Sequence, residues 1–425
     1  MSEIMTIWAE WARPSAGFPT LQWSLLLAVA AAAGHLLQRY LGLPKVAGYS
    51  MVGAFAGLAG FSGAVWPLQG AGLFLLELGV AVVLFEAGSR LSLRWFRHNP
   101  MVLVQSLLES AATFAAVFLV LRALDVELAV ARPLAVIAVA ASPAVLARVV
   151  ADIRASGLIT ERALALSTLN TLYALTLSGA MAGLMVRPRH VLADTLYPLA
   201  VVLGLSFVVA ALLALAMRTA LRVMSATSEN TAILLLALIA AGTALAAQFG
   251  ASAALAGLLG GLLLKQLHPR PWSWPAQMGT AASILTMLMF VLVSTVAAQG
   301  HWNREIALLV LAMLAARTLA RTTTLCAASF GSGMRLRQAF WTGCAMSPMS
   351  SVALLMASGY AAASPRLGPA ISAIALPSIL VMEVLGAIIA TLALRRAGES
   401  SRPWTAPSPG RGADAPAPPD KVHAA

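Results

Sequence analysis

Charged side chains are scarce in this sequence, at 10% of 425 residues, whereas an ordinary soluble domain carries about 25%. Aromatic residues are also few, and the only two cysteines, Cys326 and Cys344, both lie inside apolar runs. Two such cysteines support neither a disulfide framework nor a cysteine-based metal site. Because no nucleophile–base set or aspartate-rich metal motif occurs either, we expect no enzyme activity, no cofactor and no metal.

Long apolar runs dominate what is present. Hydrophobic residues make up 60% of the chain and the mean hydropathy is +0.85. About 20 apolar residues span a bilayer as a helix, so the sequence predicts an all-α polytopic membrane protein with about 13 transmembrane helices. We expect spans at residues 20–38, 46–63, 70–89, 99–121, 131–152, 162–186, 195–217, 230–247, 250–267, 276–298, 305–329, 338–361 and 367–394.

The net charge of +12 is explained by where the basic residues lie rather than by a nucleic-acid partner, which we do not expect. Eighteen Lys and Arg residues fall on the side of the membrane that carries the C-terminal tail, and seven fall on the other side. The positive-inside rule then places the N-terminus outside and the C-terminus in the cytoplasm. We therefore predict a multi-pass protein of the cell inner (plasma) membrane.

This topology can be tested at the C-terminal end of the last span. A reporter fused after Glu399 is expected to report a cytoplasmic position, because an odd number of spans carries the chain from outside to inside. Paired fusions of a phosphatase active only in the periplasm and a fluorescent protein active only in the cytoplasm provide the measurement. A periplasmic signal would contradict the thirteen-span topology.

Two helix breaks at matching positions are the most informative feature. Ser142-Pro143 and Ser347-Pro348 each lie near the middle of a predicted span, 205 residues and seven spans apart. Proline removes a backbone donor and clashes with the preceding turn. Because seven spans separate the breaks, they cross the membrane in opposite senses, which predicts an inverted repeat with an ion site at its centre. Glycines spaced like Gly53 and Gly57 predict close helix packing.

Several motifs, taken in order, resemble those of bacterial monovalent cation:proton antiporters, the sodium/hydrogen exchanger superfamily that includes the potassium-efflux branch. The motifs cover residues 43–49, 75–80, 85–88, 142–145, 252–257, 383–386 and 397–399. The resemblance implies an inverted-repeat antiporter fold with two crossed broken helices over residues 1–399. It also implies core helices at about 99–186 and 305–394, a scaffold made of the rest, and a homodimer. The alanine-, proline- and serine-rich residues 400–425 predict a disordered cytoplasmic tail.

The resemblance implies monovalent cation and proton substrates and an ion pathway inside the lipid bilayer. The residues at the corresponding positions are Ser142, Pro143, Asn170, Thr171, Arg317, Ser347, Pro348, Ser350 and Ser351. The chain departs from the family in span six, where relatives carry a carboxylate and this sequence has Asn170-Thr171. Neutral oxygens can bind sodium or potassium but cannot exchange a proton. Two alternatives therefore stay open, a transport-inactive relative acting as a sensor or scaffold, and an anion transporter.

Arginines inside predicted spans need a charge partner. Arg148, Arg317 and Arg321 lie within or at the ends of spans, and an unpaired arginine in a membrane is costly. Away from the ends of the expected core spans, the carboxylates are those of Glu109 and Glu383. We predict that one of them pairs with Arg317 and that either could carry a proton.

Overall fold

The computed structural model describes residues 18–61, 66–186, 192–224, 228–267, 276–300 and 302–401, and these ranges contain helices but no named strand. The helices are α2 Phe18–Leu36, α3 Lys45–Leu58, α4 Gly70–Arg90, α5 Leu93–His98, α6 Pro100–Ala123, α7 Leu128–Val139, α8 Pro143–Ile153, α9 Leu158–Val186, α10 Leu192–Val223, α11 Glu229–Gln248, α12 Ala253–Leu267, α13 Ala276–Ala297, α14 Arg304–Ala327, α15 Leu336–Ala345, α16 Ser351–Ala363 and α17 Gly368–Arg396. Short turns η1 Leu37–Leu41 and η2 Ala328–Gly331 extend α2 and α14.

The all-helical membrane fold predicted from the sequence is confirmed. Eight of the described helical stretches are long and apolar enough to cross a membrane, and shorter apolar helices supplement them. When α7 and α8 are taken as one broken segment and α15 and α16 as another, every predicted span has a matching helix. The short helix α5 is the one element outside this series among the described helices.

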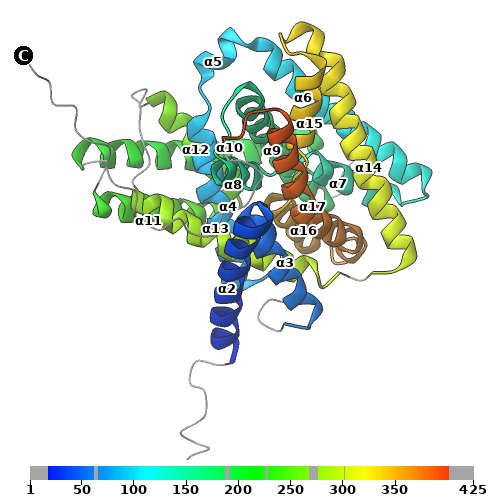
Figure 1. Ribbon diagram of the computed structural model, residues 1–425, viewed down its shortest axis with the longest axis horizontal. Helices are drawn as coiled ribbons and strands as arrows, with labels where there is room; N and C mark the ends of the chain where they lie inside the picture. Colours follow the sequence, from blue (N-terminus) through cyan, green and yellow to red (C-terminus); the bar gives the residue numbers. More distant parts are fainter. Residues whose placement is uncertain are drawn as a thin grey trace, which may run out of the picture.

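The expected core helices α6, α7 and α9 contact α14, α15, α16 and α17. The expected scaffold helices α2, α3 and α4 contact one or more of α11, α12 and α13, and α10 packs on α11 and α12. The two expected sets also touch each other, through α9 with α10 and through α17 with α3 and α13. Figure 1 shows α11 and α12 on one side of the molecule and α7 and α14 on the other, with α4, α8 and α17 between them.

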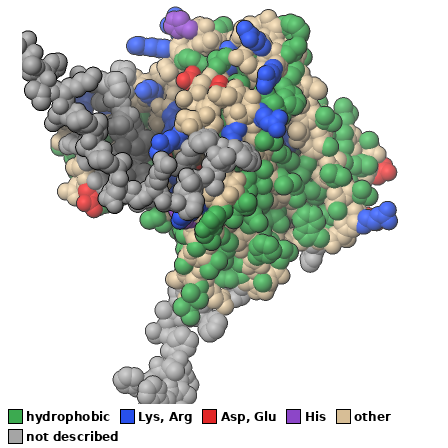
Figure 2. Space-filling model, viewed as in Figure 1, with side chains coloured by type: hydrophobic (Ala, Val, Ile, Leu, Met, Phe, Trp, Pro, Cys, Tyr) green, Lys and Arg blue, Asp and Glu red, His purple; other side chains and the backbone are tan. Residues whose placement is uncertain are grey.

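The surface is suited to a bilayer. Many large hydrophobic side chains are exposed along the helices, among them Leu25, Phe55, Leu119, Leu212 and Leu311. Figure 2 shows Lys and Arg side chains gathered at the end of the molecule that carries α5, next to a wide hydrophobic surface. A continuous apolar surface of this kind is typical of a protein that faces lipid.

Close helix packing through glycine, as predicted, joins α3 to α13. A Cβ atom on Gly53 would collide with the carbonyl oxygen of Val291, and one on Gly57 with that of Thr295. Small residues at this spacing let two membrane helices approach until their backbones touch. The α3–α13 pair is therefore a tightly packed part of the scaffold.

The segment after α17 is fastened to the loop between α8 and α9. The Glu399 carboxylate accepts hydrogen bonds from the backbone N–H groups of Ile159 and Thr160 at 2.8 and 2.7 Å. Ser400 pairs with Ala155 in an isolated antiparallel bridge. The Ser400 and Ser401 hydroxyls also donate to the carbonyls of Ile153 and Arg154, both at 3.1 Å, so the first two residues of the predicted tail are bonded to the end of α8. Residues 402–425 lie outside the described ranges.

Candidate ion site at two crossed helix breaks

Both predicted breaks are present, and they touch each other. The helix α7 ends at Val139 and α8 begins at Pro143, whereas α15 ends at Ala345 and α16 begins at Ser351. The backbone N–H of Ser142 in the first break donates to the carbonyl oxygen of Pro348 in the second, at 3.0 Å. The two extended segments therefore cross in contact, and their helix ends converge on one buried point.

Arg317 of α14 holds the crossing together. Its Nε donates to the Ala138 carbonyl at 2.9 Å and its guanidinium NH2 group donates to the Ala140 carbonyl at 3.0 Å. The other guanidinium NH2 group donates to the Ser347 carbonyl at 2.7 Å. Carbonyls that a break frees need donors in a medium without water, and the planar fork of arginine reaches several at once. Arg317 thus serves both breaks.

Glu109, one of the two carboxylates that we predicted as a partner for Arg317, is bound by Arg321 instead. Glu109 of α6 accepts from the Nε of Arg321 at 2.5 Å, and both side chains are at most 1% exposed. Arg321 also donates to the carbonyls of Met346 and Val139 at 2.6 and 3.1 Å. The prediction of a direct pair between Arg317 and Glu109 or Glu383 is therefore wrong. Arg321 lies one turn further along α14, on the same helix face.

Asn170 and Thr171 of α9 are tied to this network. The Asn170 amide donates to Glu109, and its oxygen accepts from Ser106 and Ser110 at 3.1 and 3.0 Å. The Thr171 hydroxyl lies 2.8 Å from the Ala141 carbonyl in the first break. Both side chains are fully buried, so the structure brings them next to the first break, within its hydrogen-bond network.

The serines of the second break differ from one another. Ser350 donates to the Glu383 carboxylate at 3.2 Å. Ser347 and Ser351 are each 1% exposed, and their hydroxyls make no hydrogen bond within the described chain. Buried hydroxyls without a protein partner are uncommon and need an explanation such as water or an ion. The second break therefore offers oxygens that the protein does not use.

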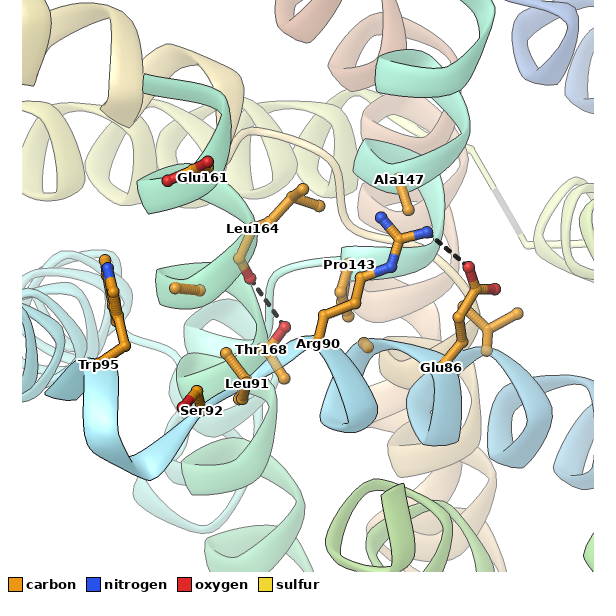
Figure 3. Close-up of a pocket in the computed structure, with 13 residues that line it drawn as sticks. Glu86, Arg90, Leu91, Ser92, Trp95, Pro143, Ala147, Glu161, Leu164 and Thr168 are labelled. Carbon is orange, nitrogen blue, oxygen red and sulfur yellow. Dashed lines mark hydrogen bonds and ion pairs between the residues drawn. The ribbon is translucent and has the colours of Figure 1, made fainter. Parts of the chain in front are cut away.

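A cavity of about 370 Å³ opens between the two helix groups and reaches the first break. Its walls come from α4 and α5 on one side and from α8 and α9 on the other (Figure 3). Pro143 and Thr168 lie among the lining residues, as does the Glu86–Arg90 ion pair at 2.6 Å. Of the predicted pathway residues, Pro143 alone lines it.

Thr168 and Glu161 are lining residues that the sequence analysis missed. Thr168 is three residues before Thr171 on α9, and its hydroxyl donates to the Leu164 carbonyl at 2.7 Å. The only signal for Thr168 in the sequence was that it is a polar residue one turn from Thr171 on an apolar helix. The cavity itself depends on how two helix groups pack, which no local motif encodes.

Two crossed broken helices in inverted orientation, joined at the centre of an apolar bundle, define the class of secondary transporters. The sequence model described as sodium/hydrogen exchanger, transmembrane, matches residues 25–397. The chain therefore belongs to the sodium/hydrogen exchanger family, whose members are membrane transporters and not enzymes.

Solved structures support the fold. The chain is similar to the sodium proton antiporter MjNhaP1 from Methanocaldococcus jannaschii at pH 8, with a TM-score of 0.64 and 15% identity, over 90% of this chain and 99% of that one. A second, electron-microscopy structure of MjNhaP1 gives a TM-score of 0.59 and 17% identity, over 95% and 96% of the chains. No curated protein matches the chain by sequence.

Proposed function

We propose that this protein is a monovalent cation:proton antiporter that exchanges sodium or potassium for protons by alternating access. The proposal rests mainly on the crossing of two broken helices, which Arg317 holds together by hydrogen bonds to both breaks. A cavity that opens on one face of the molecule ends at the first break. Helix ends and free carbonyls at such a crossing are suited to bind an ion. The sodium proton antiporter MjNhaP1 shares this fold.

The two helix groups supply the moving parts. The core, about residues 99–186 and 305–394, holds both breaks, and the scaffold provides α4 as the opposite wall of the cavity. Movement of the core against the scaffold would close this cavity and open another on the other face. We propose that the scaffold also forms the interface of a homodimer, and that the chain lies in the inner membrane with its C-terminus in the cytoplasm.

An anion transporter finds less support in these contacts. A free arginine near helix N-termini would attract an anion, but Arg317 is committed to backbone carbonyls and Arg321 to Glu109. Both guanidinium groups are fully engaged in holding the breaks. At the second break, the described hydroxyl oxygens without a hydrogen-bond partner are those of Ser347 and Ser351, and neutral oxygens suit a cation.

Purified protein in liposomes with a trapped pH dye tests the proposal. With the liposome interior made acidic, external additions of sodium or potassium chloride are expected to move protons out, whereas choline chloride is not. Replacing sodium chloride with sodium sulfate in the same assay distinguishes cation transport from anion transport, because the cation is kept and the anion is changed. Failure of every salt to move protons would overturn antiport and favour a transport-inactive sensor or scaffold.

A further inference from the structure

Glu383 is a buried carboxylate that the crossing does not use. It lies in the middle of α17, fully buried, where α17 packs against α3, α13 and the second break. The Ser294 hydroxyl of α13 donates to one carboxylate oxygen at 2.9 Å, and the Ser350 hydroxyl donates to the other at 3.2 Å. Hydroxyls from two different helix groups thus meet at one acid.

A third hydroxyl faces the same carboxyl group. Ser50 of α3 is fully buried and interacts with the Glu383 carboxyl group, but it makes no hydrogen bond of good geometry within the described chain. A buried polar group with a poor hydrogen bond is costly. A ligand between Ser50 and Glu383 that coordinates both oxygens would remove this cost.

No cation of the protein neutralises Glu383. Among the described residues, no ion pair joins it to Lys, Arg or His. The charged or titratable side chains on α17 and on the helices packed against it are Lys45 and Tyr49 of α3, Arg132 of α7, Arg148 and Asp152 of α8, Arg304, Glu305, Arg317, Arg321 and Cys326 of α14, Arg337 and Cys344 of α15, Tyr360 of α16, and Arg395 and Arg396 of α17 itself. Glu109, by contrast, is paired with Arg321.

An isolated carboxylate in an apolar interior is too costly to persist, so it must bind a proton or another cation. A protonated Glu383 is neutral and offers the three surrounding hydroxyls fewer acceptor sites than the carboxylate does. If a monovalent metal ion replaces the proton, charge neutrality is kept and the Ser50, Ser294 and Ser350 oxygens become ligands together with the carboxylate. Oxygen ligands of this kind suit hard cations.

The inverted repeat places Glu383 close to the position equivalent to Thr171. The helices α9 and α17 have the same length, 29 residues, and Glu383 falls within one turn of the position in α17 that corresponds to Thr171 in α9. Thr171 contacts the first break through Ala141, and Glu383 contacts the second break through Ser350. Each repeat therefore has a polar side chain on its last helix beside its own break, and only the second is ionisable.

We propose that Glu383, Ser50, Ser294 and Ser350 form the site that binds one monovalent alkali cation in exchange for one proton. The inference rests on the antiport function proposed above and adds the location of the exchange. When the cation enters, the O–H bond of the Glu383 carboxyl breaks, the proton leaves to water, and the carboxylate oxygens bind the cation. The reverse exchange releases the cation and restores the O–H bond.

The site is shared between the two helix groups, which links occupancy to movement. Glu383 and Ser350 belong to the core, whereas Ser50 and Ser294 belong to the scaffold. A shift of the core breaks the Ser294–Glu383 hydrogen bond, so an empty, ionised Glu383 would lose a stabilising donor during the shift. The core therefore moves with either a proton or a cation on Glu383, which is the requirement for coupled exchange.

The variants Glu383→Gln, Ser50→Ala and Ser294→Ala test the site in the full-length protein. Glutamine has nearly the shape of the protonated acid, so Glu383→Gln is expected to fold and to lose cation-dependent proton movement in liposomes completely. Each serine variant is expected to raise the half-maximal sodium or potassium concentration about tenfold, the loss of about 1.4 kcal/mol of binding free energy. Matched controls are Glu305→Gln on the surface and Ser378→Ala, a buried serine of α17 that donates to its own helix.

Proton release from detergent-solubilised protein gives a second readout that does not depend on transport. In weak buffer with a pH dye, sodium or potassium chloride should release protons from the parent and both controls, but not from Glu383→Gln, and choline chloride should release none. A parent that neither transports nor releases protons would overturn antiport itself together with this site. A parent that is active while Glu383→Gln keeps its proton release would overturn the Glu383 site alone.

Discussion

Replacing Arg321 with alanine is expected to destabilise the protein by about 3–5 kcal/mol, the usual cost of breaking a buried ion pair from one side. The variant leaves Glu109 charged in a place where both partners are at most 1% exposed. It also removes the donors to the Met346 and Val139 carbonyls, one beside each break. Thermal unfolding in detergent, followed by loss of the monodisperse peak, should show a large drop in midpoint and in yield.

A double variant separates charge from packing. Arg321→Met combined with Glu109→Gln removes both charges while keeping similar volumes, and it should recover a substantial part of the stability lost in Arg321→Met alone. The coupling between the two sites is the difference between the double variant and the sum of the singles. If Arg321→Met and the double variant lose the same amount of stability, the ion pair is not what holds α6 to α14.

Local chemistry explains why the fold was predictable. Apolar runs of membrane-spanning length and the two Ser-Pro pairs are encoded within single helices, and the structure has helices and breaks where these patterns predict them. The order of short motifs was sufficient to recognise the family that the sequence comparison shows. Each of these features depends on neighbours in the chain.

The contacts at the centre depend on tertiary packing and were only partly predictable. Arg317 and Arg321 lie on one face of α14, so their spacing cannot tell which of them meets Glu109 of α6. The choice depends on the depth at which α14 passes the breaks. With Arg317 level with the Ala138, Ala140 and Ser347 carbonyls, Arg321 is left for the carboxylate.

The surroundings of Glu383 show the same limit. The sequence indicates a carboxylate in the middle of an apolar span, but Ser294 is 89 residues away in the chain. Only the packing of α17 against α13 and α3 brings their hydroxyls together. Serines are common in membrane helices and carry no signal of which ones will meet an acid.

Replacing Arg317 with alanine is the most direct test of the crossing. The variant leaves the carbonyls of Ala138, Ala140 and Ser347 without their donor, and each unsatisfied buried group costs about 1–3 kcal/mol. Water entering the vacated space can satisfy some of these carbonyls, so we expect partial folding with complete loss of cation-dependent proton movement. The ion pair of Arg321 with Glu109 stays intact in this variant, which separates the two arginines.

Arg317→Lys sharpens the test, because it keeps a basic side chain at this position and changes the geometry of its donors. A lysine ammonium is a compact group with three donors, whereas the guanidinium presents a planar fork that bridges both breaks. If bridging is the role of Arg317, Arg317→Lys should melt nearer to the parent than Arg317→Ala does but transport poorly. If the charge alone matters, Arg317→Lys should transport like the parent in the liposome assay. Parent-like melting and transport in Arg317→Ala would instead show that the two breaks hold their crossing without an arginine.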